Sequence, residues 1–313
     1  MDAMTADARS FDAALKAMQS AIGADNVLTD NLADHGDPFA PPGEWYHPGA
    51  VLLPGSVEEV QAILRIANDL RTPVWTSSQG RNKGYGGGAP RLSGSFSLSL
   101  RRMNKVLEVD EENCMALVEP GVRFFDLYEH LRKTGSKLWM SVPDLGGGSV
   151  IGNALEHGVG YTPIGDHFGQ HCGMEVVLPN GEILRTGMGG MSNPHNWLVY
   201  PYSCGPAWDG MFSQSNYGIV TKMGVSLFHA PEVYSPGWFM LDNEAHFSTF
   251  LEVLRPLMID GTIPNQPMII NAVCAASAFW ERSHWYNGAD SIPEEILDKI
   301  AATPGLPPFP AAQ

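Results

Sequence analysis

Apolar residues recur at helical spacing in several stretches of the chain. Between Ser10 and Ile22 they lie three or four positions apart, which predicts a first helix with Ser10 as its N-cap. The same spacing follows Ser56 in the run SVEEVQAILRIANDL, where Glu59 stands three positions on and completes a capping box. Further helical patterns cover residues 124–131, 246–257 and 293–301.

Short apolar runs bounded by Gly, Pro or polar turns predict strands at residues 50–53, 73–76, 96–100, 105–109 and 115–119. A pattern typical of a β-hairpin surrounds Asn180-Gly181 in residues 173–184. After the second helix the pattern is a strand followed by a β-rich run, without regular alternation of strands and helices. The predicted class is therefore α+β and not regularly doubly wound.

The composition changes at about Pro231. Residues 1–49 hold the first helix and a loop rich in Pro, Gly and Asp, and residues 50–230 hold the β-rich part. Beyond Pro231 the sequence becomes aromatic and helical, so we expect residues 231–313 to begin a second domain. A chain of 313 residues that is 44% hydrophobic and 17% charged is long enough for this division.

The net charge of −15 opposes a phosphate backbone, so nucleic acid is not an expected partner. The acidic excess either solubilises the surface or steers a basic protein partner. No segment reaches the ~18 consecutive apolar residues of a membrane span, and no basic region precedes an apolar run at the N-terminus. We expect a soluble, cytoplasmic protein.

The cysteines are far apart and form neither a CxxC pair nor a Cys/His ligand spacing, which predicts buried free thiols, with no disulfide framework and no zinc site. They are Cys114, Cys172, Cys204 and Cys274.

A first glycine-rich segment, residues 77–90, reads SSQGRNKGYGGGAP. Glycines allow positive φ and let backbone N–H groups approach a pyrophosphate, while Arg81 or Lys83 could offset its charge. The string is neither a Walker A loop nor a GxGxxG turn, and a tight connection is the alternative interpretation. The candidate binding residues here are Ser78, Gly80, Arg81, Asn82, Gly84 and Gly86.

A second glycine-rich segment, residues 143–167, reads PDLGGGSVIGNALEHGVGYTPIGDH. Ordering so many glycines costs backbone entropy, which a tightly bound cofactor would offset, and two such segments favour a dinucleotide over a plain surface loop. The candidates are Pro143, Asp144, Gly146, Gly147, Ser149, Gly152, Asn153, Glu156, Gly158, Gly160 and Tyr161. A polar turn before an apolar strand adds Gly218, Ile219 and Val220, which could present backbone groups to an adenine edge or form an ordinary turn.

Other polar residues of the second segment are assigned structural roles. Glu156 and Asp166 lie ten positions apart and could be an acid–base pair, but we favour structural hydrogen bonds for both. His157, His167 and His171 are expected in a loop without the helical HExxH context, so no metal site is predicted.

A resemblance to the vanillyl-alcohol oxidase and 4-cresol methylhydroxylase family of flavoproteins is carried by GRNKGYGGGAP, VEPGV, LWMSVPDLGGGSVIGNALEHGVGYTPIGDHF, GMEVVLPNGEILRTGMG and DGMFSQSNYGIVTK. With PGAVLLPGSVEEVQAILRIAN and LRPLMIDGTIPN it covers residues 30–300. It implies FAD as cofactor, a two-subdomain FAD-binding fold in residues 50–230, and an incomplete α/β cap domain in residues 231–313. It also implies oxidation of para-substituted phenols by hydride transfer to flavin N5, through a quinone methide that takes up water.

The resemblance carries two catalytic residues onto this chain. Tyr85 matches the tyrosine that hydrogen-bonds the phenolate oxygen, with an amphipathic Tyr at a loop edge as the alternative. Ser141 stands where the alcohol oxidases have an aspartate near flavin N5 and the methylhydroxylases a serine, which favours a dehydrogenase that passes electrons to a c-type cytochrome. Family members form homodimers or pair with that cytochrome, and some are periplasmic.

Family members are considerably longer than this chain. The residue that links flavin covalently, a second phenolate-binding Tyr with its Arg, and another carboxylate are not found here, so we expect the chain alone to be inactive or nearly so. The alternatives are another FAD-linked oxidase acting on a hydroxy acid or sugar, and a non-catalytic flavin-binding protein. GVGYTPIGDH followed by GMEVVLPNG favours the phenol-oxidising family.

Overall fold

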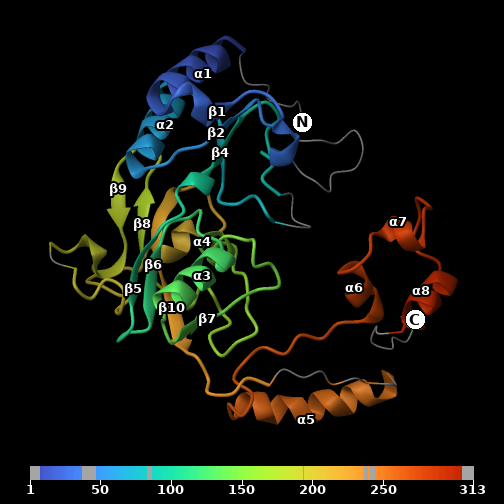
Figure 1. Ribbon diagram of the computed structural model, residues 1–313. Helices are drawn as coiled ribbons and strands as arrows, with labels where there is room; N and C mark the ends of the chain where they lie inside the picture. The colour runs from blue at the N-terminus through green and yellow to red at the C-terminus, as the bar shows by residue number, and fades with distance from the viewer. Residues whose placement is uncertain are drawn as a thin grey trace. The chain divides into compact units, whose positions relative to one another are not determined.

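The computed structural model describes residues 8–36, 47–82, 87–192, 194–235, 239, 241 and 244–304. The chain divides into two compact units (Figure 1). The first comprises Met1–Gly160 and Ile164–Ala230, and the second comprises Tyr161–Pro163 and Pro231–Gln313. In the part of the chain that the structure describes, no helix is long and apolar enough to cross a bilayer.

The first sheet of the first unit is small and mixed. Its strand order is β1-β2-β4-β3, with β2 and β3 parallel to β4 and with β1 antiparallel to β2. The apolar sides of α1 and α2 pack with it around one core, which includes Met18, Ile63 and Phe96. The elements are α1 (Ala8–Ile22), β1 (Val27–Leu28), β2 (Ala50–Leu52), α2 (Val57–Asp69), β3 (Val74–Ser77) and β4 (Phe96–Ser99).

The two N-terminal helices test the capping predictions. The N-cap predicted for α1 is wrong, because the helix begins at Ala8 and the Ser10 hydroxyl donates to the carbonyl of Leu70 (2.6 Å). Ser56 is confirmed as the N-cap of α2, since its hydroxyl accepts from the N–H of Glu59 (3.3 Å). The Glu59 carboxylate accepts from the N–H of Gly55 (2.7 Å), one residue before the cap.

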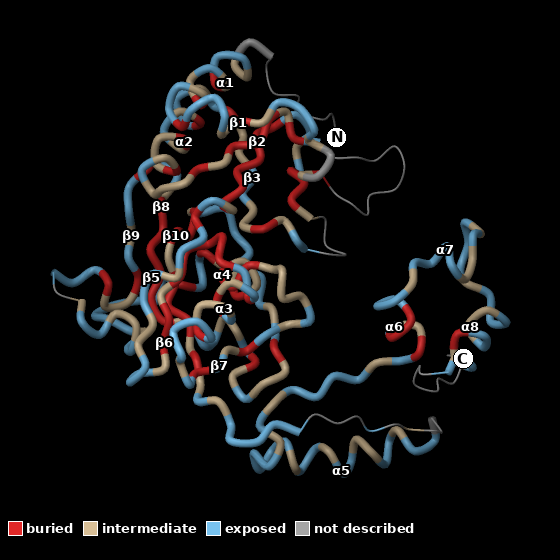
Figure 2. The backbone as a smooth tube through the Cα atoms, viewed as in Figure 1, coloured by how far each residue is buried: buried red, intermediate tan, exposed pale blue. Residues whose placement is uncertain are grey.

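The second sheet is antiparallel and larger, with the order β5-β6-β10-β8-β9, and β7 pairs with the last part of β10. Both α3 and α4 pack against it around a second core that includes Leu127, Ile151 and Met174. Buried residues follow the two sheets (Figure 2). The elements are β5 (Val106–Asp110), β6 (Met115–Val118), α3 (Phe124–Thr134), β7 (Leu138–Met140), α4 (Val150–Leu155), β8 (His171–Val177), β9 (Ile183–Arg185) and β10 (Ile219–His229).

The hairpin predicted at Asn180-Gly181 is confirmed and also joins the two subdomains. Gly181 has a φ of 82°, and its carbonyl accepts from Gln61 (2.6 Å) and Arg65 (3.2 Å) on α2. Asn68 of α2 donates to the carbonyl of Pro179 in the same turn. The two sheets are thereby held in a fixed relation within the first unit.

Short 3₁₀ helices complete the connections. They are η1 (Ala24–Asn26), η2 (Leu32–His35), η3 (Leu100–Arg102), η4 (Gly187–Gly190), η5 (Asp209–Phe212) and η6 (Glu244–His246), the last in the second unit.

All the regular elements described in the second unit are helices, joined by turns and irregular segments. Its helices are α5 (Phe247–Ile259), α6 (Ala272–Ser277), α7 (Arg282–Trp285) and α8 (Glu294–Ala301). The helices predicted at residues 246–257 and 293–301 are therefore confirmed as α5 and α8. A small core joins Ala272 and Ala276 of α6 to Ile300 of α8. No strand occurs among its described residues, so its assignment as an α/β cap domain stays a prediction.

Candidate cofactor site

The first glycine-rich segment leaves the first sheet at the end of β3. Gln79 is buried, and its amide nitrogen donates to the carbonyl of Gly121 (2.5 Å). Arg101 donates from Nε (3.1 Å) and Nη2 (2.9 Å) to the carbonyl of Gln79. Gly80 has a φ of 61°, which other residues rarely adopt, and Gly88 closes against it. The start of the segment is therefore a fixed bend, and its backbone carbonyl at Gln79 accepts hydrogen bonds from the guanidinium of Arg101.

Arg101 is a candidate that the sequence analysis missed. β3 and β4 are parallel with Ser77 opposite Ser99, so the segments that follow them leave the same edge of the sheet. Arg101 lies two residues beyond Ser99 and thus reaches the first segment. The basic pair Arg101-Arg102 after a predicted strand was the only signal, and using it required knowing that these strands are parallel neighbours.

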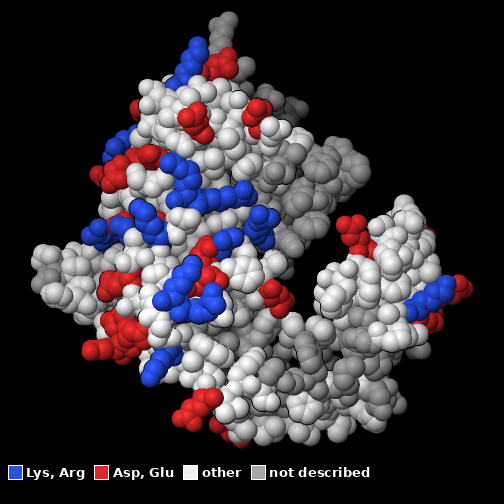
Figure 3. Space-filling view, in the orientation of Figure 1, with Lys and Arg blue, Asp and Glu red and all other residues white. Residues whose placement is uncertain are grey.

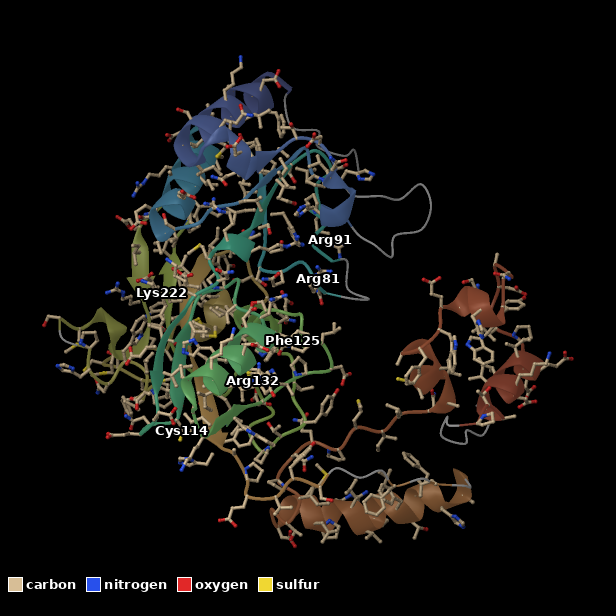
Figure 4. The ribbon with its side chains drawn as sticks, viewed as in Figure 1. Arg81, Arg91, Cys114, Phe125, Arg132 and Lys222 are labelled. Atoms are coloured by element: carbon tan, nitrogen blue, oxygen red, sulfur yellow. The ribbon has the colours of Figure 1, made fainter. Side chains whose placement is uncertain are left out.

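The rest of the first segment is more exposed. Arg81 and Asn82 are exposed near the point where the described part ends (Figure 4). Lys and Arg side chains form a band across the middle of the first unit on the face shown in Figure 3. The predicted residues Gly84, Tyr85 and Gly86 lie outside the described residues, so their roles stay predictions.

The start of the second segment is tied to the VEPGV turn. The Ser149 hydroxyl caps α4 by accepting from the N–H of Gly152 (2.9 Å), and it donates to the carbonyl of Pro120 (2.6 Å). The next residue, Gly121, has no room for a side chain, since its β-carbon would lie 2.6–2.8 Å from three carbonyl oxygens in and just after η3. Close backbone approach therefore explains this glycine.

The two glycine-rich segments meet. A β-carbon on Gly152 would collide with the hydroxyl oxygen of Ser78. Gln79 reaches Gly121, the residue after Pro120, to whose carbonyl Ser149 donates. The predicted residues Ser78, Gly80, Ser149 and Gly152 are thus brought to one region of the first unit, as the prediction of a dinucleotide clamp requires.

Ser141, Asn153 and His167 form a hydrogen-bonded cluster. The hydroxyl oxygen of Ser141 lies 2.8 Å from Nε2 of His167, and Nδ1 of His167 is hydrogen-bonded to Oδ1 of Asn153. A β-carbon on Gly160 would collide with the Ser141 hydroxyl and the imidazole, and one on Gly158 with the Asn153 amide. The glycines of the second segment therefore make room for this cluster.

Burial lowers the pKa of His167 to about 4, and the nearby carboxylate of Asp166 only partly opposes this shift. The imidazole is neutral at neutral pH. A cavity of about 30 Å³ lies beside the cluster, and its lining is mainly apolar with four polar residues, Ser141, His167, Gln170 and Ser226. Such a space holds roughly one or two water molecules and no larger ligand.

The other predicted residues of the second segment differ in how they are placed. The carbonyl of Gly146 accepts from the N–H of Phe125 (3.0 Å), whose ring covers it, while Gly147 has open space where a side chain would stand. Pro143 is half-buried and Asp144 is exposed. Two further candidates are not part of the cluster: Glu156 is the C-cap of α4, and Tyr161 belongs to the second unit.

The predicted residues Gly218, Ile219 and Val220 lie at the start of β10. Ile219 and Val220 pair with β8 and bury their side chains, and Gly218 packs against the side chain of Val176. Their side chains serve the core, so any contact with a ligand would come from the backbone.

The histidines considered as metal ligands each have a separate partner. His157 lies 3.1 Å from the Ser213 hydroxyl, and Nε2 of His171 lies 3.1 Å from the Asp209 carboxylate. His171 is the first residue of β8, so its placement in a loop was wrong. Among the described residues no group of three or more His, Cys, Asp or Glu could hold a metal ion.

The cysteine prediction needs a correction. All four thiols are free, but only Cys172 is buried, whereas Cys114 is intermediate and Cys204 and Cys274 are exposed. Burial raises the pKa of Cys172 to about 11, helped by the charge of Asp209.

Comparison with known proteins accounts for this arrangement. Residues 48–187 match the FAD binding domain family. Over 302 residues the chain is 38% identical to the 4-cresol dehydrogenase [hydroxylating] flavoprotein subunit of Pseudomonas putida, covering 95% of this chain and 58% of that one. The chain belongs to the 4-cresol methylhydroxylase family of flavoproteins. Its cofactor is therefore FAD, and the observed glycine bends and guanidinium fit a dinucleotide.

Solved structures of the family share the fold. p-Cresol methylhydroxylase with substrate bound superposes with a TM-score of 0.89 at 36% identity, over 96% of this chain and 60% of that one. The 4-ethylphenol oxidase from Gulosibacter chungangensis superposes with a TM-score of 0.88 at 38% identity, over 97% of this chain and 59% of that one. The α+β, two-subdomain FAD-binding fold is thus confirmed. The chain spans about three fifths of these relatives.

Proposed function

We propose that this chain is the FAD-binding part of an oxidoreductase that oxidises para-substituted phenols. The 38% identity to a 4-cresol dehydrogenase subunit carries the proposal, because it extends over 95% of the chain and includes both glycine-rich segments and most of the second unit. A similarity confined to the cofactor fold would not indicate a substrate. The two superposed flavoproteins are named for phenols as well.

The two glycine-rich segments supply the cofactor site in this proposal. Gly80 and Gly152 let backbone groups come close to the ligand, while Arg81 and Arg101 offset the charge of the pyrophosphate. The remaining candidates of residues 77–90 and 143–167, with those at the start of β10, line the site. Bound FAD supplies the acceptor for a hydride taken from the substrate.

Tyr85 and Ser141 are the proposed substrate-side residues. The Tyr85 hydroxyl donates to the phenolate oxygen and so favours loss of hydride at the para position. Ser141 is only 6% exposed and carries a neutral hydroxyl where a carboxylate would introduce charge. We infer that it favours a dehydrogenase over an oxidase, although one relative of each kind is 38% identical to the chain.

The partners follow from the same proposal. A dehydrogenase of this family passes its electrons to a c-type cytochrome, and assembly as a homodimer is a further option. The second unit begins the domain that covers the substrate. We propose the cytoplasm as the location of the protein, with the periplasm as the alternative that the family offers.

Anaerobic reduction of the bound flavin tests the proposal. The purified chain is loaded with FAD, and 4-cresol is added without oxygen. The visible absorption band of the oxidised flavin is followed. Since the chain alone is expected to be nearly inactive, we expect slow bleaching with 4-cresol and none with D-lactate or glycolate. Bleaching by a hydroxy acid alone would overturn the substrate class, and binding without any bleaching would leave a flavin-binding protein.

The physiological acceptor needs a separate measurement. After bleaching, reoxidation by air is compared with reoxidation by oxidised cytochrome c. Fast reoxidation by cytochrome and slow reoxidation by oxygen are expected of a dehydrogenase. The reverse order would assign an oxidase.

A further inference from the structure

Cys114 and His229 form a thiol–imidazole pair at one end of the second sheet. The Sγ atom of Cys114 lies 3.6 Å from Nε2 of His229, a hydrogen-bonding distance for sulfur. With the ring hydrogen on Nδ1, Nε2 carries a lone pair and accepts the hydrogen of the thiol. In Figure 4, Cys114 lies toward the lower end of the first unit, well away from Arg81 of the first glycine-rich segment.

Strand pairing fixes both residues of the pair. Cys114 closes the turn between β5 and β6, and its carbonyl accepts from the N–H of Leu227 on β10 (2.7 Å). His229 is the last residue of β10 and pairs with Leu138 of β7. The backbone on either side of the contact is therefore part of the sheet, and the nucleophile and the base are held within reach of each other.

Neither the backbone nor the packing at Cys114 requires a cysteine. Its φ is 53°, a left-handed conformation that glycine or asparagine adopts more easily. Its side chain packs at the edge of the second core and is intermediate in exposure, so a small apolar residue would fill the same space. What sets this thiol apart is its contact with an exposed imidazole, which a reagent can reach from solvent.

The charges near the pair are mainly negative. Asp110, Glu111 and Glu112 lie in the turn just before the cysteine, and both glutamates are exposed. On the side of β7, Lys137 is also exposed, and its carbonyl accepts from the N–H of Ala230 (2.8 Å), the residue after the histidine. Three carboxylates against one ammonium group attract a cationic reagent and repel an anionic one.

We propose that Cys114 and His229 are a nucleophile–base pair, and that Cys114 is a modification site for small disulfides, cationic ones in particular. The thiol passes its hydrogen to Nε2 of His229, and its sulfur attacks one sulfur of the disulfide. The S–S bond of the reagent breaks, and its second half leaves as a thiolate that takes the proton from the imidazole. The products are a mixed disulfide on Cys114 and one free thiol.

The relative rates of the four cysteines test the pair. The full chain is treated with cystamine, a disulfide with two positive charges, and the modified peptides are quantified by mass spectrometry over time. Cys204 and Cys274 are more exposed than Cys114 but have no histidine partner among the described residues, whereas Cys172 is buried, which raises its pKa to about 11. We expect Cys114 to react about tenfold faster than the two exposed thiols, and Cys172 last. Exposure alone predicts that Cys204 and Cys274 react first, and that order would overturn the proposal.

Removal of the base is the second test. His229→Ala should lower the rate at Cys114 by about tenfold, although the smaller side chain leaves the thiol more open. Added imidazole should restore part of the rate, because a free base can replace the missing one. The rate at Cys204 in the same molecule should not change, which reports that the fold is intact. His195→Gln is the matched control, since His195 is exposed and has no cysteine partner in the described part of the chain.

The outcomes of this second test are distinct. An unchanged rate at Cys114 in His229→Ala would overturn the role of the imidazole as a base. A loss of rate that imidazole does not restore would overturn it as well, because a purely structural role of His229 predicts that result.

A second reagent tests the preference for cations. Oxidised glutathione carries a net negative charge, so Cys114 should react with it more slowly than with cystamine, and added salt should reduce the difference. Glu111→Gln combined with Glu112→Gln should reduce it too. Equal rates for the two reagents would overturn the preference. These measurements need no FAD, so their outcome is independent of the flavin-bleaching test of the proposed function.

Discussion

The hydroxyl oxygen of Ser78 occupies the place where a β-carbon of Gly152 would have to stand. Ser78 belongs to the first glycine-rich segment and Gly152 to the second, so this contact sets how closely the two segments approach. Any side chain at position 152 would force the Ser78 hydroxyl to move. The spacing of the proposed cofactor site therefore depends on one glycine in the first turn of α4.

Gly152→Ala should weaken FAD binding by about tenfold or more, because the added methyl group pushes Ser78 and the first segment away. Titration of flavin fluorescence measures the affinity. Gly210→Ala is the control, since nothing lies within 4 Å of the position of its β-carbon. Equal affinities of Gly152→Ala and wild type would show that the contact does not set the site.

Arg101→Met should also lower the affinity for FAD, by about tenfold, because it removes a positive charge and both hydrogen bonds to the carbonyl of Gln79. Arg101→Lys keeps the charge without the paired hydrogen bonds and should lie between Met and wild type. Exposed Arg91 provides the control variant Arg91→Met. Equal affinities of all three variants and wild type would remove Arg101 from the site.

The elements predicted correctly are those whose signals are local. α2 follows from its apolar period and from Ser56, and the β8–β9 turn from Asn180-Gly181, since a few neighbouring residues decide each conformation. Ser10 is not an N-cap although its residue type suits one, because α1 already includes Ala8 and the Ser10 hydroxyl donates to the distant carbonyl of Leu70.

The contacts that build the candidate site are not local. Ser141 and His167 are 26 positions apart, and their pairing depends on how β7 and the second segment pack. Arg101 reaches Gln79 only because β3 and β4 are parallel neighbours. Residue types and motif order predicted which segments matter, but strand order decided which side chains meet.

Glu175→Gln should destabilise the first unit by about 2–4 kcal/mol, because two cations would lose their buried partner. The Glu175 side chain is 1% exposed and pairs with Arg185 (2.7 Å) and Lys222 (2.9 Å) across β8, β9 and β10. Burial opposes its charge, but the hydrogen bonds from these two cations prevail and lower its pKa. Urea unfolding measures the free energy change.

Glu129→Gln is the control for that variant. Glu129 pairs with Arg132 and Lys133 on the surface of α3, where all three side chains are well exposed. Exposed pairs contribute about 0–1 kcal/mol, so the change should be small. Similar losses in both variants would mean that burial of Glu175 adds nothing.

The pKa of His167 makes the stability of the first unit depend on pH. Its pKa falls from 6.5 to about 4 on folding, so between these values the unfolded chain takes up a proton that the folded chain does not. The stability due to the neutral imidazole is therefore complete above pH 6.5 and is lost as the pH falls toward 4. Because the imidazole is only partly buried, we expect a loss of about 1–2 kcal/mol over this range.

His167→Gln removes this titration, so its free energy of unfolding should fall less steeply than that of wild type between pH 6.5 and 4. Exposed His195 supplies the control variant His195→Gln, which should keep the wild-type slope. Urea unfolding at several pH values within this window gives both slopes. Parallel curves for wild type and His167→Gln would mean that His167 binds its proton equally well in the folded and unfolded chains.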